Sequence, residues 1–527
     1  MEDSLIISAS VDDEKPASNK YVEESRQIAT IDQFLDQIGQ VGRFQVCVIL
    51  CMSAMILVAG YQSLFIVFGF QAPPWKCTGI NMHECNSTHL FNYGVPGFES
   101  RCHMNRSSWT YATPKTFSIV TDYDLVCSRK VLSVLADSAH FIGVILAGLP
   151  LAYASDVYGR KPVLMISFTG VCACSFFLGF SPNIGVVILF RVLTGGCICG
   201  MLMTISVLAL ELVGPKYRTF AGLVFWNAWT VGLCLLSVQS WFVHEWKVLA
   251  MVTSAPYLVF VLAFLFVPES VRWYQSQNRT NEAEAVLQKA AAVNGKDYPW
   301  NKCLSTVQDI REAKSSSYRV LFSSCKECLQ TFALCWMWFT NDLNYYGIAI
   351  ASGDFGGALH RDFVLFSICE IPGNLITIYI LDKIGRKRST LIGYVATSLS
   401  LISFGFMQHF DVKLMPLRVS LGIISKMFNI LAWSATSVWS GELYPTHVRS
   451  QAVGLFIIVS QCGSFFSPWI AKWLKNYSVA LPFFIFGGFP FVAGCLSLQL
   501  KETMGKSMDG EDVIHDPEDL IVASEQI

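Results

Sequence analysis

Charged residues are scarce in this chain. Asp, Glu, Lys and Arg make up 15% of its 527 residues, whereas soluble domains carry about a quarter. Apolar residues reach 53%, and the mean hydropathy is +0.45. This shortage excludes the class of soluble enzymes and indicates a protein that crosses a membrane several times. The formal net charge of −1 gives no basis for expecting a nucleic-acid partner.

Several functional signatures are also missing. Residues 1–40 contain no apolar core of a signal peptide, so we expect the amino terminus to stay in the cytosol. No nucleophile–base pair, phosphate loop or metal-ligand cluster stands out, so neither an enzyme nor a cofactor is predicted. Cys325 and Cys328 have the spacing of a zinc or redox pair, but no second pair accompanies them, so no metal site is expected.

Long apolar segments fill most of the remaining chain. Six are expected before residue 268, at 43–69, 131–153, 163–180, 184–208, 219–241 and 247–267. Six more are expected at 328–350, 361–380, 389–407, 414–438, 452–472 and 479–500. They divide the chain into a cytosolic segment 1–42, a first half 43–267, a cytosolic loop 268–327, a second half 328–500 and a cytosolic acidic tail 501–527. Gly60 and Tyr61 are expected to interrupt the first span, and short helices are expected at 281–294 and 304–314 in the central loop.

The two halves share motifs. Asp156-Val157-Tyr158-Gly159-Arg160-Lys161-Pro162 recurs as Asp382-Lys383-Ile384-Gly385-Arg386-Lys387-Arg388, and 382 − 156 gives an offset of 226 residues. Glu211 with Arg218 is matched by Glu442 with Arg449, and Pro268-Glu269-Ser270 is echoed by Lys501-Glu502-Thr503. Three motifs in one order at a nearly constant offset predict two copies of one membrane bundle, the architecture of a transporter with repeated halves.

Two independent signals predict the orientation. The loop 71–130 contains the glycosylation sequons at Asn86 and Asn105 and four cysteines, Cys77, Cys85, Cys102 and Cys127. Sequons and paired cysteines are typical of an extracellular, oxidising environment, although four cysteines allow three pairings. Arg160 and Lys161 follow the second span, and positive loops stay in the cytosol. Both signals place the long loop outside.

Ionisable residues within the spans are candidates for the transport path, because a charge at membrane depth is costly. Those residues are Asp137, His140, Arg191, Asp342, Glu370 and Lys426. Glu370 precedes Ile371-Pro372-Gly373, where we expect the helix to break. Lys426 can pair with either Glu370 or Asp342. Arg191 is expected in a structural pair near the cytoplasmic end of its span, close to the Asp156 turn.

The Asp156 and Asp382 turns resemble the signature loop of the major facilitator superfamily. Within it, the chain is similar to the organic cation, organic anion and carnitine transporters, solute carrier family 22. The similarity rests on the cysteine-bearing loop that ends Asp122-Tyr123-Asp124-Leu125-Val126-Cys127, on Pro268-Glu269-Ser270-Val271-Arg272-Trp273, on Tyr345-Tyr346-Gly347 and on Glu442-Leu443-Tyr444-Pro445-Thr446 with Val448-Arg449. It implies an all-α membrane fold of twelve helices, in two pseudo-symmetric halves, that works by alternating access.

The resemblance also assigns roles to residues. In the outward-facing state the basic turns would clamp the cytoplasmic face, with Glu211, Arg218, Glu442 and Arg449 in one charge network. The gating residues would then be Asp156, Gly159, Arg160, Arg191, Glu211, Arg218, Asp382, Gly385, Arg386, Glu442 and Arg449. Trp229, Tyr345, Tyr346 and Glu370 fall at positions of the family pocket.

One pocket position departs from the family pattern. Gln461 lies on the eleventh span, where cation carriers tend to have an acid and many anion carriers a base. A neutral amide leaves Glu370, Asp342 and Lys426 as candidate charges, and aromatic faces attract ammonium groups. The sequence therefore predicts a plasma-membrane carrier of small organic cations or zwitterions, such as amines, betaines or carnitine-like molecules.

Two alternatives remain open. Lys426 would be the selector of an organic anion carrier, and a non-transporting receptor would use the glycosylated loop instead. The expected partners are the substrate, the lipid bilayer and a possible cytosolic protein that binds the tail. A uniporter is the default, with sodium or proton coupling as further options.

Overall fold

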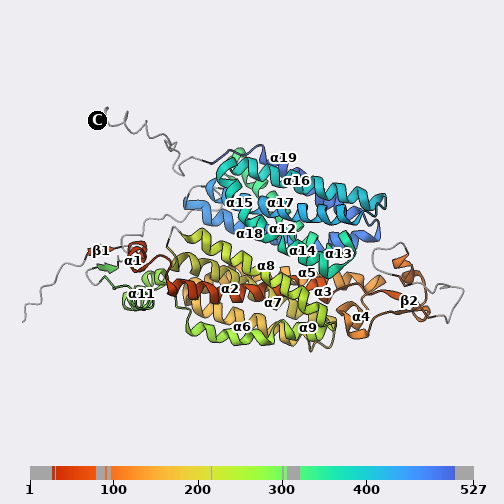
Figure 1. The fold of residues 1–527 in the computed structure, drawn as a ribbon, viewed down its shortest axis with the longest axis horizontal. Helices are drawn as coiled ribbons and strands as arrows, with labels where there is room; N and C mark the ends of the chain where they lie inside the picture. Colours follow the sequence, from red (N-terminus) through yellow and green to blue (C-terminus); the bar gives the residue numbers. More distant parts are fainter. Residues whose placement is uncertain are drawn as a thin grey trace, which may run out of the picture.

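A computed structural model describes residues 27–29, 31–78, 90–91, 97–214, 217–299, 302–304, 321–444 and 446–504. Long helices dominate this part of the chain, and they form two groups that lie side by side along the molecule's long axis (Figure 1). The helices of the first half occupy one side of the bundle and those of the second half the other. The two groups correspond to the two sequence repeats.

The first half is built from apolar helices that follow the hydropathy pattern closely. Its elements are α2 Arg43–Leu64, α3 Ile66–Gly69, α5 Lys130–Tyr158, α6 Arg160–Leu178, α7 Ile184–Leu212, α8 Arg218–Phe242, α9 Trp246–Val252 and η6 Ala255–Leu265. The second half repeats this arrangement. It consists of α12 Cys325–Ile350, α13 Ser352–Gly356, α14 Leu359–Ile368, α15 Glu370–Ile384, α16 Arg386–His409, α17 Met415–Glu442, α18 Thr446–Pro468, η9 Trp469–Trp473, η10 Leu474–Asn476 and α19 Leu481–Ser497.

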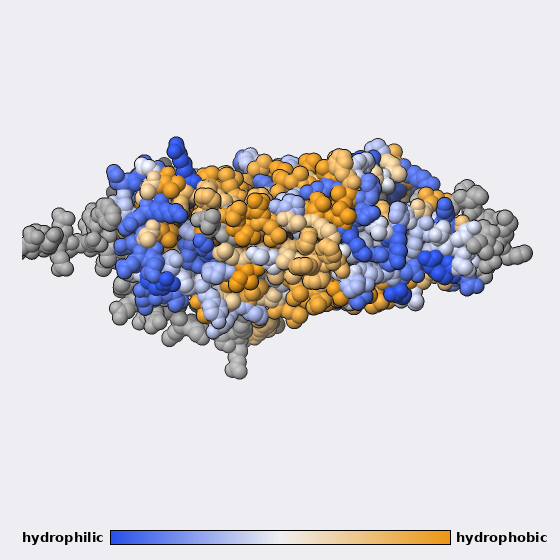
Figure 2. Space-filling view, turned by 90° about the horizontal axis from the view of Figure 1, so that it is seen from below, coloured by the Kyte–Doolittle hydropathy of each residue, from blue (hydrophilic) through white to orange (hydrophobic). Residues whose placement is uncertain are grey.

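Within the described residues, nine helices are long and apolar enough to cross a membrane, and the segments 246–262 and 481–497 are shorter apolar helices. The 26-residue α12 makes the twelfth segment, although the polar residues along it lower its hydropathy. On the face seen in Figure 2, apolar surface covers the middle of the molecule and hydrophilic surface gathers toward its two ends. Apolar side chains on the long helices are exposed, among them Leu146 and Ile166. The predicted twelve-helix membrane fold is confirmed.

The two ends of the bundle carry different structures (Figure 1). At one end, which we call the loop end, β2 Trp75–Cys77 pairs antiparallel with β3 Trp109–Tyr111, beside α4 Ile119–Asp122. At the other, the turn end, α1 Ile31–Ile38 lies near α10 Val271–Ser276 and α11 Thr280–Asn294, and β1 Gln27–Ala29 pairs parallel with β4 Lys302–Leu304. The loop and the central connection therefore cap opposite ends of the bundle.

The loop is tied together by disulfide bonds. Cys102 and Cys127 are bonded to each other, which anchors the loop at the start of α5, and Cys77 is also disulfide-bonded. Asn105 is exposed just before the short helix η2 Arg106–Ser108. Cys85 and Asn86 lie outside the described residues.

Three helix boundaries differ from those expected from the sequence. Gly60 doesn't interrupt the first span, because α2 continues through it to Leu64. A Cβ at Gly60 would lie 2.9 Å from the carbonyl oxygen of Trp229, so this glycine allows α2 and α8 to pack closely. The eighth span divides at Cys369, directly before Glu370, and not at Ile371-Pro372-Gly373 as expected, because those residues lie within α15. Of the helix expected at 304–314, Leu304 instead lies in β4, and 305–314 fall outside the described range.

Candidate functional site

The first basic turn joins α5 to α6 through Gly159, whose φ of +104° lies in the left-handed region. The carboxylate of Glu269 accepts hydrogen bonds from the backbone N–H groups of Arg160 at 2.9 Å and Lys161 at 3.1 Å. These groups belong to the first turn of α6, where a helix attracts negative charge. A Cβ at Gly159 would lie 2.4 Å from Oε2 of Glu269, so both the turn and the cap require glycine.

The second basic turn repeats this geometry in the other half. Gly385 has a φ of +92°, and Glu502 accepts hydrogen bonds from the backbone N–H groups of Arg386 and Lys387, both at 3.0 Å. In the sequence, the Glu269 and Glu502 motifs indicate the repeat, and the Glu269 motif also contributes to the family resemblance, but neither indicates a helix cap. Because the two glutamates lie 109 and 116 residues after the arginines whose backbone N–H groups donate to them, no local pattern shows that each caps a helix.

The arginines of the two turns form ion pairs within their own halves. Arg160 contacts Asp156 at 2.9 Å and Glu211 at 3.6 Å, and Arg386 contacts Glu442 at 3.1 Å. Among the described residues, no ion pair at the turn end joins the two halves. Of the charge network expected from the resemblance, the described residues form the Arg160–Glu211 and Arg386–Glu442 pairs, and neither pair joins the two halves in this conformation.

Arg218 and Arg449, the remaining basic gating candidates at this end, contact other groups. Arg218 pairs with Asp32 at 3.3 Å, and Arg449 donates to the backbone oxygen of Tyr444 at 3.4 Å. Asp382 is exposed at the start of the second turn. It also lines the central cavity described next.

A cavity of about 590 Å³ lies between the two halves. Aromatic and polar side chains line its deep part, namely Trp226, Trp229, Asp342, Tyr345, Tyr346, Glu370, Trp433 and Gln461. From there it extends to Asp382 and Arg386 in the second turn. The cavity thus reaches the turn end, and this volume suits a small organic ligand.

Glu370 and Lys426 form an ion pair in the wall of this cavity. Their charged atoms are 3.1 Å apart, and Glu370 also accepts a hydrogen bond from Thr230 of the first half at 2.8 Å. The Lys426 amine lies 3.3 Å from the ring centroid of Tyr345, and the side chain is only 2% exposed. Of the two acids considered as its partner, Glu370 is the one that neutralises Lys426.

Asp342 lies in the same cavity in a different environment. It is 1% exposed, and it accepts hydrogen bonds from Nε2 of Gln461 and Oγ of Ser464, each at 3.1 Å. Within the part of the chain that the structure describes, it forms no ion pair, and its Oδ1 has no hydrogen-bond partner. A buried carboxylate without a cation is costly, so this position favours binding of a positive charge.

The aromatic candidates from both halves meet at the cavity. Nε1 of Trp229 donates a hydrogen bond to the hydroxyl of Tyr345 at 2.8 Å, linking α8 to α12. The Tyr345 ring centroid lies 5.3 Å from that of Tyr346 and 5.5 Å from that of Trp433. Trp433 was not singled out in the sequence, although it follows Lys426 by two helical turns.

At the loop end the cavity is closed by contacts between the halves. Asp137 of α5 pairs with Lys472 of η9, and Oγ of Ser138 donates to the backbone oxygen of Phe465 at 2.9 Å. One turn deeper, the Phe141 ring lies 4.7 Å from that of Tyr346. The structure is therefore closed at the loop end and accessible from the turn end.

Arg191 is at this closed end, contrary to the expectation that it lies near the Asp156 turn. It is the eighth residue of α7, and it donates to the backbone oxygen of Gln62 at 2.9 Å. Glu211, which pairs with Arg160, lies 20 residues further along the same helix, roughly 30 Å away at 1.5 Å per residue. Hydropathy locates a membrane span but does not show which end of the span faces the basic turns, so it does not place a single charged residue within it. Arg191 is thus not part of the network at the basic turns.

A model of the sugar (and other) transporter family matches residues 92–513. Solute carrier family 22 member 1 of Bos taurus is 28% identical, over 93% of this chain and 93% of that protein. The organic cation transporter protein of Drosophila melanogaster is 28% identical, over 91% and 94%. Organic anion transporter 3 of Oryctolagus cuniculus is 26% identical, over 94% and 95%.

The fold also resembles solved structures. The inward open conformation of the xylose transporter XylE from E. coli matches with a TM-score of 0.61 over 89% of this chain and 99% of that one. Its sequence identity of 15% makes this a likeness of fold alone.

Proposed function

This chain belongs to the sugar (and other) transporter family, and from that membership we propose that it carries small organic cations or zwitterions by alternating access. It is a multi-pass membrane protein whose fold is that of a solute transporter of the major facilitator superfamily, not of an enzyme. The relatives include proteins named for organic cations and for organic anions, so the substrate class must be argued from the cavity of this chain.

The observation that carries the proposal is Asp342. It is a buried carboxylate in the cavity wall, its hydrogen-bond donors are neutral, and no ion pair compensates it in the described part of the protein. An ammonium group there would supply the missing charge. Tyr345, Tyr346 and Trp229 provide faces that favour a cation.

The cavity supports the alternative of an organic anion carrier less well. Lys426 would have to be the selector, but Glu370 already neutralises it, and Lys426 is not among the residues that line the cavity. Glu370, expected from the resemblance to bind substrate, does line the cavity, but the pair it forms leaves it no free charge. We therefore propose that Asp342, and not Glu370, binds the cationic group of the substrate.

The proposed orientation follows from the sequons and the basic turns. The loop end would face outside, where Asn105 is exposed for glycosylation, and the turn end would face the cytosol, with both termini there. The plasma membrane is the proposed location, and in this orientation the conformation described above would be open to the cytosol.

The first prediction concerns Asp342→Asn. We expect it to reduce uptake of tetraethylammonium by at least tenfold, because the neutral amide keeps the shape of the site but removes its charge. The measurement is uptake of the radiolabelled cation into proteoliposomes containing the purified protein. Asp362→Asn is the matched control, since Asp362 is equally buried but pairs with Arg361 outside the cavity. Unchanged uptake in Asp342→Asn would remove the basis for the proposed substrate class.

A second prediction uses the contact between Gln461 and Asp342. In Gln461→Lys, an amine would lie beside the carboxylate and neutralise it, so cation uptake should fall to the level of Asp342→Asn. Gln461→Asn keeps the amide and should retain most of the activity. If Gln461→Lys carried tetraethylammonium as well as the unmodified protein, Asp342 would not be the cation site.

A further inference from the structure

A second cavity, of about 640 Å³, lies at the loop end. We call it the loop-end chamber. Its walls come from the loop through Phe98, Arg101 and Thr113, from the first half through Lys130, and from the second half through Lys475. It is therefore enclosed by three separate parts of the chain.

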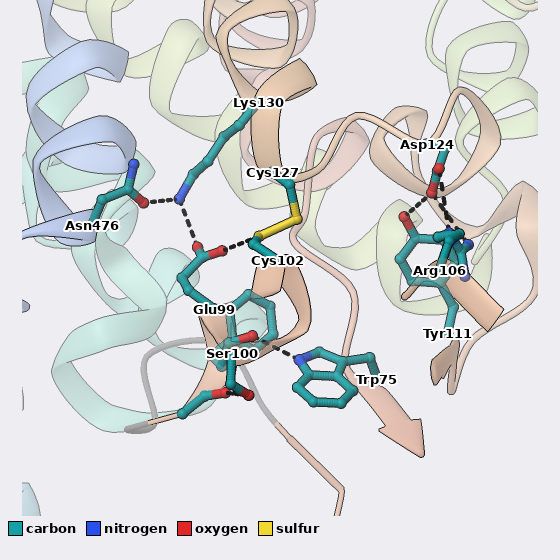
Figure 3. Close-up of a disulfide and its surroundings, with 12 residues drawn as sticks. Trp75, Glu99, Ser100, Cys102, Arg106, Tyr111, Asp124, Cys127, Lys130 and Asn476 are labelled. Atoms are coloured by element: carbon teal, nitrogen blue, oxygen red, sulfur yellow. Dashed lines mark hydrogen bonds and ion pairs between the residues drawn. A yellow bond between two sulfur atoms is a disulfide. The ribbon is translucent and has the colours of Figure 1, made fainter. Parts of the chain in front are cut away.

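The lysines of the loop-end chamber are each matched by one carboxylate. Lys130 contacts Glu99 at 2.7 Å and also the side chain of Asn476, beside the Cys102–Cys127 disulfide (Figure 3). Lys475 pairs with Asp354, and Lys472 pairs with Asp137. These three ion pairs leave no net charge.

Arg101 adds a positive charge that has no such match. The residue is 4% exposed, and it forms no ion pair within the described residues; its Nε and Nη1 atoms also lack hydrogen-bond partners there. Its guanidinium lies 4.2 Å from the ring centroid of Phe98 and 5.5 Å from that of Trp109. Burial lowers the pKa of Arg101 from its ordinary value, and the nearby carboxylates of Glu99 and Asp124 offset only part of this effect.

A second polar group of the chamber also lacks a partner. The Oγ1 atom of Thr113 is buried and accepts or donates no hydrogen bond among the residues described. Arg101 and Thr113 both line the loop-end chamber, and each carries an N–H or O–H group without a hydrogen-bond partner among the described residues. A carboxylate accepts such donors, and the flat guanidinium binds it through two parallel hydrogen bonds.

From this arrangement we propose that the loop-end chamber binds a small organic anion, a carboxylate with an apolar body, through Arg101 and Thr113. Phe70, Phe98 and Phe117 line the same chamber and suit an aromatic or aliphatic body. The volume is in the range of small-molecule sites.

This site is separate from the central cavity. Lys472 lines the chamber and contacts Asp137 of α5. Tyr346 lines the central cavity and contacts Phe141, one turn further along α5. The closed contacts between the halves thus divide the two sites. Anion binding in the chamber does not depend on the substrate proposed for the central cavity.

The test is equilibrium binding of radiolabelled benzoate to the full-length protein in lipid nanodiscs, with benzamide as a neutral competitor. Benzoate should bind, and benzamide should not displace it. Arg101→Gln should weaken benzoate binding at least tenfold. Arg106→Gln is the matched control, because Arg106 also lies over Trp109 in the loop but pairs with Asp124 and does not line the chamber.

Thr113→Val provides a second test that keeps the side chain's shape, so it answers the question even if Arg101→Gln disturbs the loop. It should weaken benzoate binding several-fold. The proposal is overturned if the unmodified protein does not bind benzoate, or if both variants bind it as well as the Arg106→Gln control. Asp342→Asn should still bind benzoate, so failure of this site and failure of the proposed cation transport can be told apart.

Discussion

At the scale of single residues, the two acids that line the cavity differ in their partners. Glu370 is satisfied by Lys426 and Thr230, whereas Asp342 has only neutral donors. Both acids are buried, so burial alone does not identify the residue that meets a cation. What distinguishes them is the partner supplied by another helix.

A third prediction follows from the buried pair. Removing one member leaves an uncompensated charge, so Lys426→Met and Glu370→Gln should each destabilise the protein by about 3–5 kcal/mol. The double variant should be more stable than either single variant, because no charge is then left alone. Thermal unfolding of the purified proteins measures this coupling. Additive losses would show that the two side chains do not interact.

The sequence could identify these residues but not their pairing. It placed Asp342, Glu370, Lys426 and Gln461 at membrane depth, yet Lys426 was equally compatible with either acid. The choice depends on how α12, α15 and α17 are rotated against one another, and apolar patterning on lipid-facing helices does not fix that rotation. Arg101 and Thr113 carried no motif at all, since their significance arises only from the cavity that they line.

At the scale of elements, the two basic turns are matched devices. Each combines a glycine with positive φ and a distant glutamate that caps the next helix, Glu269 in the first half and Glu502 in the second. The helix boundaries themselves were largely predictable, because polar turns interrupt long apolar runs. The helix caps were harder to predict from the sequence, since Glu269 lies 109 residues after Arg160 in the chain.

A fourth prediction concerns Gly159→Ala. The added methyl would require a strained backbone and would meet the Glu269 carboxylate, so the cap on α6 should be lost. We expect less folded protein and at least a several-fold fall in transport per folded molecule. Gly441→Ala is a suitable control, because nothing lies within 4 Å of a Cβ at that glycine. Size-exclusion profiles and uptake, measured together, separate folding from transport. Equal behaviour of the two variants would contradict the role assigned to the turn.

At the scale of the whole molecule, the contacts between the halves are unequally distributed. Ion pairs at the turn end stay within each half, whereas Asp137 and Lys472 join the halves at the loop end. The twofold architecture followed from the repeated motifs, and the comparison with known proteins confirms the fold. The conformation did not follow, because one sequence must serve every conformation that a transporter adopts.

A fifth prediction tests the pair at the loop end. Asp137→Asn removes a contact that exists only when this end is closed, so the equilibrium should move toward opening there by about tenfold. Distances between spin labels on the exposed residues Lys115 and Lys413, which belong to opposite halves, would report the change. Asp411→Asn is the control, since its partner Lys413 lies in the same exposed segment. In this control the second spin label is placed on Phe410 instead of Lys413, so that the partner of Asp411 is kept. An unchanged distance distribution in Asp137→Asn would show that the pair does not hold the halves together.

The junction at Lys130 has a practical consequence. This amine touches Glu99 of the loop, which the disulfide fastens to the first half, and also Asn476 of the second half. Rocking of the halves would separate Glu99 from Asn476. The two residues therefore form a composite epitope that exists in one conformation, and an immunoglobulin raised against it would arrest the carrier without entering either cavity.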